Sequence, residues 1–101
     1  MELINAISKV RFGSAKPQRI QLNKGDGCQA EMLCMEPGQQ IRVRSGRWLY
    51  YVITGSANLT VNGQTSQLPT GQLAASAPNE QHVVATAGDR RLVCLVIGQA
   101  S

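Results

Sequence analysis

Short segments rich in β-branched and aromatic residues recur along the chain, and turns of glycine, proline or asparagine separate them. Segments spaced by about 8–12 residues in this way are typical of an all-β sandwich or barrel. No longer stretch shows the apolar period of a helix. We therefore expect a short helix or strand at residues 3–10 and strands at residues 19–22, 29–35, 40–44, 48–54, 57–61, 64–68, 72–76, 82–86 and 91–97.

Asn62 and Gly63 separate two of these segments and mark a tight turn. Both residue types tolerate positive φ, which both central positions of a type I′ turn require. The pair therefore predicts a β-hairpin between residues 57–61 and 64–68.

The chain has 101 residues, so we expect a single domain over residues 1–101. Hydrophobic residues make up 43% of it, which is enough for one core. No apolar run approaches the roughly 20 residues that span a bilayer, and the N-terminus lacks the basic-then-apolar order of a secretion signal. We expect a cytoplasmic protein with no membrane partner.

The formal net charge is +4, and the basic residues are dispersed along the chain. Nucleic-acid binding requires a contiguous basic face, usually with aromatic side chains that stack on bases. The chain has one Trp, two Tyr and one Phe. A solvated basic surface is therefore the better interpretation, and we expect no nucleic-acid partner.

Two of the expected strands, residues 48–54 and 91–97, are apolar on both faces. In a single antiparallel barrel the outer face of each strand normally contacts solvent. An apolar outer face therefore needs a second layer outside the barrel to cover it. This pattern predicts a homodimer with Leu49, Tyr51, Val93 and Leu95 at the interface. The alternative is an N-terminal segment that folds over the same surface.

The chain from residue 32 to residue 97 resembles the cupin superfamily. Pro37-Gly38 is followed by YYVITGSANLTVNG, by a turn that contains glycine, and by an apolar strand near His82. The resemblance implies a double-stranded β-helix, the jelly-roll barrel of RmlC-like proteins. It also implies dimers, and in most members a metal ion held inside the barrel by three His and one Glu.

The metal-binding motifs of cupins are only partly present. Their first motif is G-x5-H-x-H-x3,4-E-x6-G, and counting from Gly38 places Arg44 and Gly46 at its two His positions. Counting back from Gly55 places Trp48 at the Glu position, and the interval between the two glycines is two residues short. In the second motif, the glycine-to-histidine spacing from Gly71 is kept by His82.

The chemistry of these residues argues against a metal. A guanidinium group has no lone pair to offer and stays protonated, and an indole offers only an N–H donor. A single imidazole does not hold a divalent ion alone. We expect no metal and no other cofactor. A metal enzyme using His82 with cysteines, which form no CxxC pair, or with borrowed ligands is a further alternative.

The residues at these positions indicate an anion pocket instead. Trp48 and Tyr50 share a strand face, and by the resemblance that face, with Arg44 and His82, lines the barrel interior. We expect a metal-free protein that binds a small anionic organic ligand in the barrel, through Arg44, Trp48, Tyr50, His82 and Arg42. In a second interpretation, Arg42 and Arg44 lie at the rim of the barrel and their guanidinium groups reach solvent.

Two other functions are consistent with the same residues. His82 and Tyr50 are candidate catalytic residues of a metal-independent isomerase, epimerase or lyase, acting as acid and base. In the other alternative, Trp48, Tyr50 and Met32 fill the barrel, and the protein is a structural or interaction module.

Overall fold

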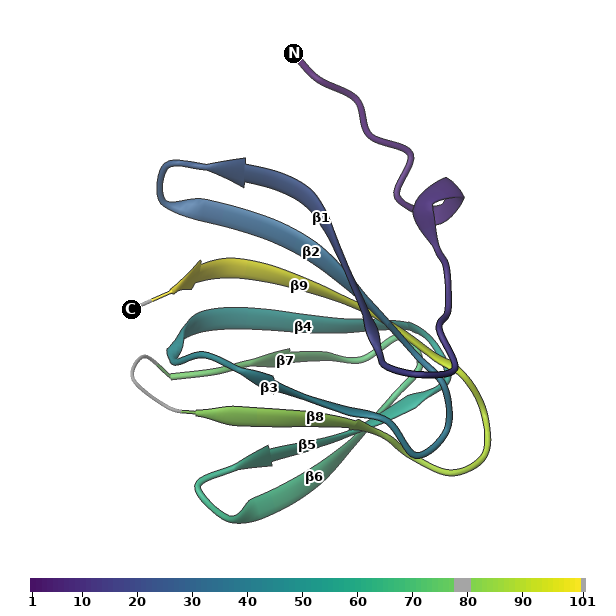
Figure 1. The fold of residues 1–101 in the computed structure, drawn as a ribbon. Helices are drawn as coiled ribbons and strands as arrows, with labels where there is room; N and C mark the ends of the chain where they lie inside the picture. Colours follow the sequence, from purple (N-terminus) through teal and green to yellow (C-terminus); the bar gives the residue numbers. More distant parts are fainter. Residues whose placement is uncertain (78–80, 101) are drawn as a thin grey trace.

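Nine strands and one short 3-10 helix form the regular structure of the described residues, 1–77 and 81–100, in a computed structural model of the chain (Figure 1). Every segment expected to be a strand is one, with ends shifted by up to three residues, so the all-β prediction is confirmed. Within this part of the chain no helix has the length and apolarity that crossing a membrane requires. The elements are η1 (Ile7–Lys9), β1 (Gln18–Gly25), β2 (Cys28–Met35), β3 (Gln40–Val43), β4 (Gly46–Thr54), β5 (Ser56–Val61), β6 (Gln64–Pro69), β7 (Leu73–Ala75), β8 (His82–Thr86) and β9 (Leu92–Ala100).

The strands form two antiparallel sheets. One has the order β1-β2-β9-β4-β7 and the other the order β3-β8-β5-β6. One inner strand of each sheet, β9 or β8, comes from the C-terminal third of the chain, so neighbours in space are distant in sequence. This interleaving is the jelly-roll arrangement that the resemblance implied.

The core lies between the two sheets because alternate residues of the facing strands are apolar. In β4, Trp48, Tyr50 and Val52 are buried, whereas Leu49 and Tyr51 are exposed. The same alternation in the opposite sheet turns Ile41 and Val43, Leu59 and Val84 inward. The other core members are Leu33, Met35, Ala57, Leu68, Leu92, Cys94 and Val96.

The hairpin between β5 and β6 turns at Asn62 and Gly63, as predicted. Their φ angles are 52° and 80°, so both central residues have the positive φ of a type I′ turn. The ladder runs without interruption from Val61 and Gln64, beside the turn, to Ser56 and Pro69.

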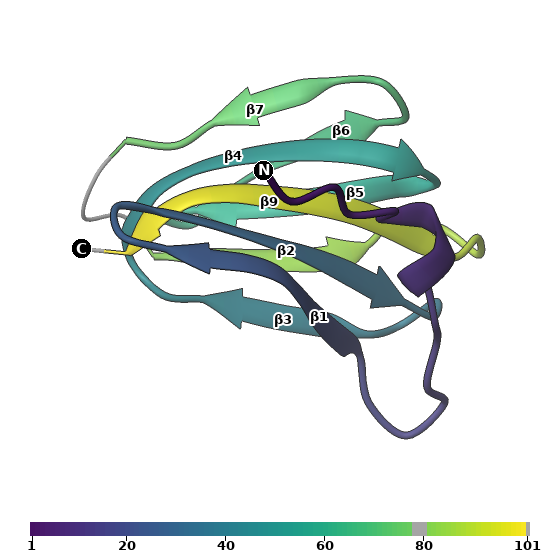
Figure 2. The same cartoon turned by 90° about the horizontal axis from the view of Figure 1, so that it is seen from above.

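A second apolar cluster covers part of the outer face of the five-stranded sheet. Ile20, Met32, Cys34 and Val93 are buried there beneath partly buried residues of the N-terminal segment, Ala6, Val10 and Phe12. Figure 2 shows this segment passing over the sheet. Val93 was expected at a dimer interface, but the same chain covers it. In the alternative of a filled barrel, Met32 was one of the filling side chains, but it belongs to this outer cluster.

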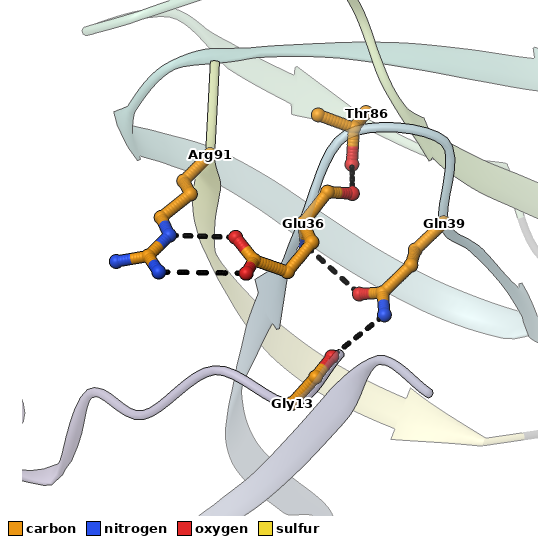
Figure 3. A network of polar contacts seen from close by, with 5 residues as sticks. All are labelled: Gly13, Glu36, Gln39, Thr86 and Arg91. Atoms are coloured by element: carbon orange, nitrogen blue, oxygen red, sulfur yellow. Dashed lines mark hydrogen bonds and ion pairs between the residues drawn. The ribbon is translucent and has the colours of Figure 1, made fainter. Parts of the chain in front are cut away.

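A polar network holds the base of the N-terminal segment (Figure 3). The Gln39 side chain donates from Nε2 to the Gly13 carbonyl at 2.7 Å and accepts the Glu36 backbone N–H at 2.8 Å. Arg91 donates from Nε to the Glu36 carboxylate at 2.6 Å, and its guanidinium lies 4.5 Å from the centre of the Phe12 ring. The segment is therefore fixed at residues 12–13 to the loops before β3 and β9.

Candidate functional site

A hydrogen bond between Tyr50 and His82 crosses the barrel interior. Tyr50 Oη and His82 Nδ1 are 2.6 Å apart, and the two rings meet edge to face with their centres 5.5 Å apart. The side chains come from opposite sheets, and both residues are almost fully buried, at 1% and 0% exposure. Burial is the main cause that raises the pKa of Tyr50 above its ordinary value. The phenol therefore keeps its proton at neutral pH.

Trp48 lies on the same face of β4 as Tyr50, nearer to one end of the barrel. Its indole Nε1 donates to the Arg44 carbonyl at 2.9 Å, and its backbone N–H donates to Ser76 Oγ at 2.8 Å. These two bonds fix the indole beside the chain that links β3 to β4. The side chain is 4% exposed, so it forms a wall of the barrel end and not a surface group.

A cavity of about 200 Å³ opens at this end of the barrel, between Trp48 and the β1–β2 hairpin. Cross-strand pairing places Arg19 opposite Leu33, which belongs to the core, and Gln21 opposite Glu31. These hairpin side chains therefore lie on the inner face of the sheet. The cavity is lined by Arg19, Gln21, Asn23, Lys24, Gln29, Ala30, Glu31, Arg44 and Trp48. We call it the mouth cavity.

The mouth cavity has an excess of positive charge. Arg19 donates from Nη2 to Oε1 of the Glu31 carboxylate at 2.8 Å, and this pair is neutral overall. In the part of the chain that the structure describes, Lys24 and Arg44 form no ion pair. Two uncompensated cations therefore lie beside the indole of Trp48.

The structure divides the five ligand residues expected from sequence into three groups. Trp48, Tyr50 and His82 are inside the barrel. Arg44 is exposed at the mouth, so the expectation that it points inward with His82 was wrong. Arg42 is exposed on the outside of the four-stranded sheet.

The reason for the two corrections is the pleat of β3. Ile41 and Val43 occupy its inward positions, so Arg42 must point outward. Arg44 follows the last residue of the strand and leaves the sheet, which lets its side chain reach the mouth cavity from outside.

The polar residues of the β1–β2 hairpin were missing from the site expected from sequence. Their signal was present: Ile20 and Leu22 alternate with Arg19 and Gln21, so one face of β1 is polar. Alternation shows that a strand has one polar face, but it does not show which face points inward. Ile20 and Leu22 turn outward here because the N-terminal segment provides their apolar neighbours.

The residues at the metal-ligand positions of the resemblance do not fit a metal ion. Gly46 has no ligating side chain, and a Cβ there would lie against the Gln99 carbonyl and 2.8 Å from Trp48 Nε1, so a histidine has no room. Arg44 brings positive charge, and Trp48 offers only the N–H that it already donates. Among the residues described, no three His, Cys, Asp or Glu side chains lie close enough together to hold an ion.

The fold and the sequence of the barrel correspond to a known family. A family model for the cupin domain matches residues 31–98 of the chain. The chain belongs to the cupin family. A search of curated proteins finds no match for this cupin.

Solved structures resemble this cupin over its whole length. A protein from Thermus thermophilus has a TM-score of 0.88 at 19% identity, with 100% of both chains covered. An uncharacterized protein with a double-stranded β-helix domain from Klebsiella pneumoniae has a TM-score of 0.86 at 22% identity, covering 100% of this chain and 94% of its own. A candidate mannose-6-phosphate isomerase from Ralstonia eutropha has a TM-score of 0.76 at 20% identity, with 100% of both chains covered. At these identities the likeness shows the shared fold alone.

Proposed function

We propose that this cupin binds a small anionic organic molecule in the mouth cavity without a metal. The observation that carries the proposal is the lining of that cavity: three cationic side chains against one carboxylate, beside a fixed indole. Arg44 supplies a planar fork of donors that matches a carboxylate or phosphate group. Lys24 adds a second positive charge, and Trp48 supplies an apolar wall for the carbon skeleton.

The cavity volume limits the size of the ligand. A volume of about 200 Å³ lies below the roughly 300–1,000 Å³ of pockets that hold drug-sized ligands, so the cavity suits a smaller molecule. The amide groups of Gln21, Asn23 and Gln29 add partners for hydroxyl or carbonyl groups. These features favour a short hydroxy- or keto-carboxylate.

The chain's single tryptophan makes the proposal directly testable, because Trp48 lies in the cavity wall. Short hydroxy- and keto-carboxylates and inorganic phosphate are titrated while the emission of Trp48 is recorded, and binding is repeated by calorimetry. We expect saturable binding that weakens with added salt. Arg44→Ala should weaken it by about 10-fold or more, because a charge-assisted hydrogen bond is lost.

Arg42→Ala is the matched control. It removes the same charge two residues away, but from the outer side of the four-stranded sheet, so affinity should stay within about twofold of wild type. If both variants lose affinity equally, the effect is one of net charge and the cavity is not the site. If Arg44→Ala binds every detected ligand as well as wild type does, the proposal is wrong.

A second candidate function rests on the bond between Tyr50 and His82. A protonated phenol that contacts an imidazole at 2.6 Å is an acid–base pair, and such pairs move protons in isomerases, epimerases and lyases. The likeness to a candidate isomerase supports this reading by analogy alone. A substrate must displace Trp48 or open the barrel to reach the pair, because both residues are buried.

Proton exchange distinguishes the two candidates. Each carboxylate that quenches Trp48 is incubated with the cupin in D2O, and incorporation of deuterium beside its carboxylate or carbonyl is followed by NMR. Exchange that disappears in both Tyr50→Phe and His82→Asn supports an enzyme. Binding without exchange leaves the protein as a binding module, and exchange that survives in Tyr50→Phe excludes the phenol as the acid.

A further inference from the structure

A groove lies between the N-terminal segment and the outer face of the five-stranded sheet. Figure 2 shows the segment passing over the sheet there. The groove has a volume of about 710 Å³, which is within the roughly 300–1,000 Å³ of ligand pockets. Its lining is mainly apolar, with Ile7, Val10 and Phe12 on one side and Ile53 and Val93 on the floor. We call it the outer groove.

A β-bulge in β4 shapes the floor of the outer groove. Val52 pairs with Cys94 and Thr54 pairs with Val93, so Ile53 is the extra residue between the two pairs. A bulge bends its strand and re-aims the side chains there. Two consecutive residues, Ile53 and Thr54, consequently both line the groove, one with an apolar side chain and one with a hydroxyl group.

The polar groups of the outer groove lie where β4 ends and β9 begins. Arg90 and Arg91 directly precede β9, and Thr54 is the last residue of β4. The charge of Arg91 is compensated, because its Nε donates to the Glu36 carboxylate at 2.6 Å. Arg90 follows Asp89 in the chain, but it forms no ion pair with any of the described residues. An uncompensated cation therefore lies at one end of an apolar groove.

Contacts within the chain hold one wall of the outer groove in place. The Arg91 guanidinium lies 4.5 Å from the centre of the Phe12 ring, and Glu36 holds that guanidinium (Figure 3). The Gln39 side chain binds the Gly13 carbonyl, next to Phe12, at 2.7 Å. A ligand therefore does not have to order this wall when it binds, which saves the entropy that such ordering costs.

We propose that the outer groove binds a single-chain alkyl carboxylate of medium length. The alkyl chain lies on Ile53 and Val93, beneath the N-terminal segment, and the carboxylate accepts hydrogen bonds from Arg90 and from the Thr54 hydroxyl. A cation at the end of an apolar groove is complementary to an anionic head on an apolar chain. The inference does not rest on the proposed function, because the mouth cavity has a mainly polar lining and lies on the inner face of the sheet.

The first test is a chain-length series. Hexanoate, octanoate and decanoate are titrated by calorimetry below their micelle concentrations. Each added methylene should strengthen binding by up to about fourfold, because it is buried in the groove. The emission of Trp48 should not change, since Trp48 lies inside the barrel. The proposal is overturned if affinity does not rise with chain length, or if decanoate quenches Trp48 and a short hydroxy-carboxylate reverses the quenching.

Two pairs of variants locate the site. Arg90→Ala should weaken decanoate binding by about fivefold or more, whereas Arg42→Ala, on the outside of the other sheet, should change it by less than about twofold. Ile7→Glu places a carboxylate in the groove and should weaken binding by about tenfold or more. Its control is Leu3→Glu, since Leu3 is outside the groove lining, and both positions are largely exposed, at 61% and 87%. Wild-type affinity in both Arg90→Ala and Ile7→Glu overturns the proposal.

Other occupants of the groove would give different results. Binding to vesicles of phosphatidylglycerol and phosphatidylcholine, without binding of free decanoate, would indicate a membrane surface. A second copy of the chain in the groove would give a dimer by light scattering that does not bind decanoate. Either result overturns the proposal. Decanoate binding that follows both the chain-length series and the variant pairs supports it.

Discussion

The Tyr50 phenol and the His82 imidazole join the two sheets of the barrel through a hydrogen bond of 2.6 Å. Among the described residues, His82 and Thr86 are the buried polar ones, so this contact crosses an otherwise apolar interior. In cupins with a metal, the resemblance places a ligand where His82 stands. Here the imidazole meets a phenol, and the other ligand positions hold an arginine, a glycine and a tryptophan.

Tyr50→Phe should destabilise the fold by about 1–3 kcal/mol, because it removes a buried hydrogen bond and leaves the ring shape unchanged. Urea unfolding at neutral pH measures this change. Tyr51→Phe is the neighbouring control, since the Tyr51 side chain points outward and is 40% exposed, and we expect a change within about 0.5 kcal/mol. Equal stability of the two variants would show that the Tyr50 bond contributes nothing.

Alkaline pH should destabilise this cupin through its buried acids. Burial raises the pKa of Cys94 from 9.0 to about 12 and also raises the pKa of Tyr50, so the native chain holds protons that the unfolded chain releases. The stabilisation that comes from these two buried protonated groups is complete below about pH 9 and is lost as pH rises toward their pKa values in the native state. The free energy of unfolding should therefore fall above about pH 9. The slope of this free energy against pH should be smaller in Tyr50→Phe. An identical slope in this variant would contradict the assignment of part of the alkaline destabilisation to Tyr50.

One of the three thiols should react quickly with a disulfide reagent in the native protein. Cys28 is exposed, whereas Cys34 and Cys94 are buried, and burial raises the pKa of both buried thiols. We expect one equivalent of fast reaction in buffer and three in urea. Cys28→Ser should abolish the fast phase. A fast phase of two or three equivalents in wild type would mean that the reagent reaches Cys34 in the outer cluster or Cys94 in the core.

Gly46→Ala should cost about 1–3 kcal/mol, because an added methyl group overpacks the start of β4 beside Trp48. Its Cβ would press on the Gln99 carbonyl and lie 2.8 Å from the Ala100 Cα. Gly25→Ala is the control, since a Cβ there lies 3.7 Å from the nearest atom, which is an ordinary contact. Thermal melts of the two variants give the comparison, and similar melting temperatures would show that the site near Trp48 can relax.

The strands were predictable because their signal is local. Alternation in β4 and β8 and the Asn62-Gly63 turn depend on neighbouring residues alone, and each was correct. The ends of β1 and β9 were less accurate, since they extend by pairing with β2 and β4 beyond their own apolar residues.

The site was less predictable because motif counting does not determine side-chain direction. Trp48, Tyr50 and His82 were placed correctly inside the barrel, since each lies within a strand whose alternation is clear. Arg44 was misplaced because it lies one residue beyond the end of β3, where alternation no longer applies. Lys24 and Glu31 line the site because the pairing of β1 with β2 brings both strands to the mouth cavity, which motif counting does not indicate.

The order of residues was enough to specify an all-β cupin barrel without the usual metal ligands, because turn chemistry, strand periodicity and motif spacing are properties of neighbours along the chain. The assignment of each sheet face depended on packing between distant segments. The N-terminal segment covers Val93 and turns Ile20 outward, and this leaves the polar side chains of the hairpin to line the mouth cavity. Which side chains are buried depends on contacts among all segments of the chain, so burial is determined only in the assembled tertiary structure.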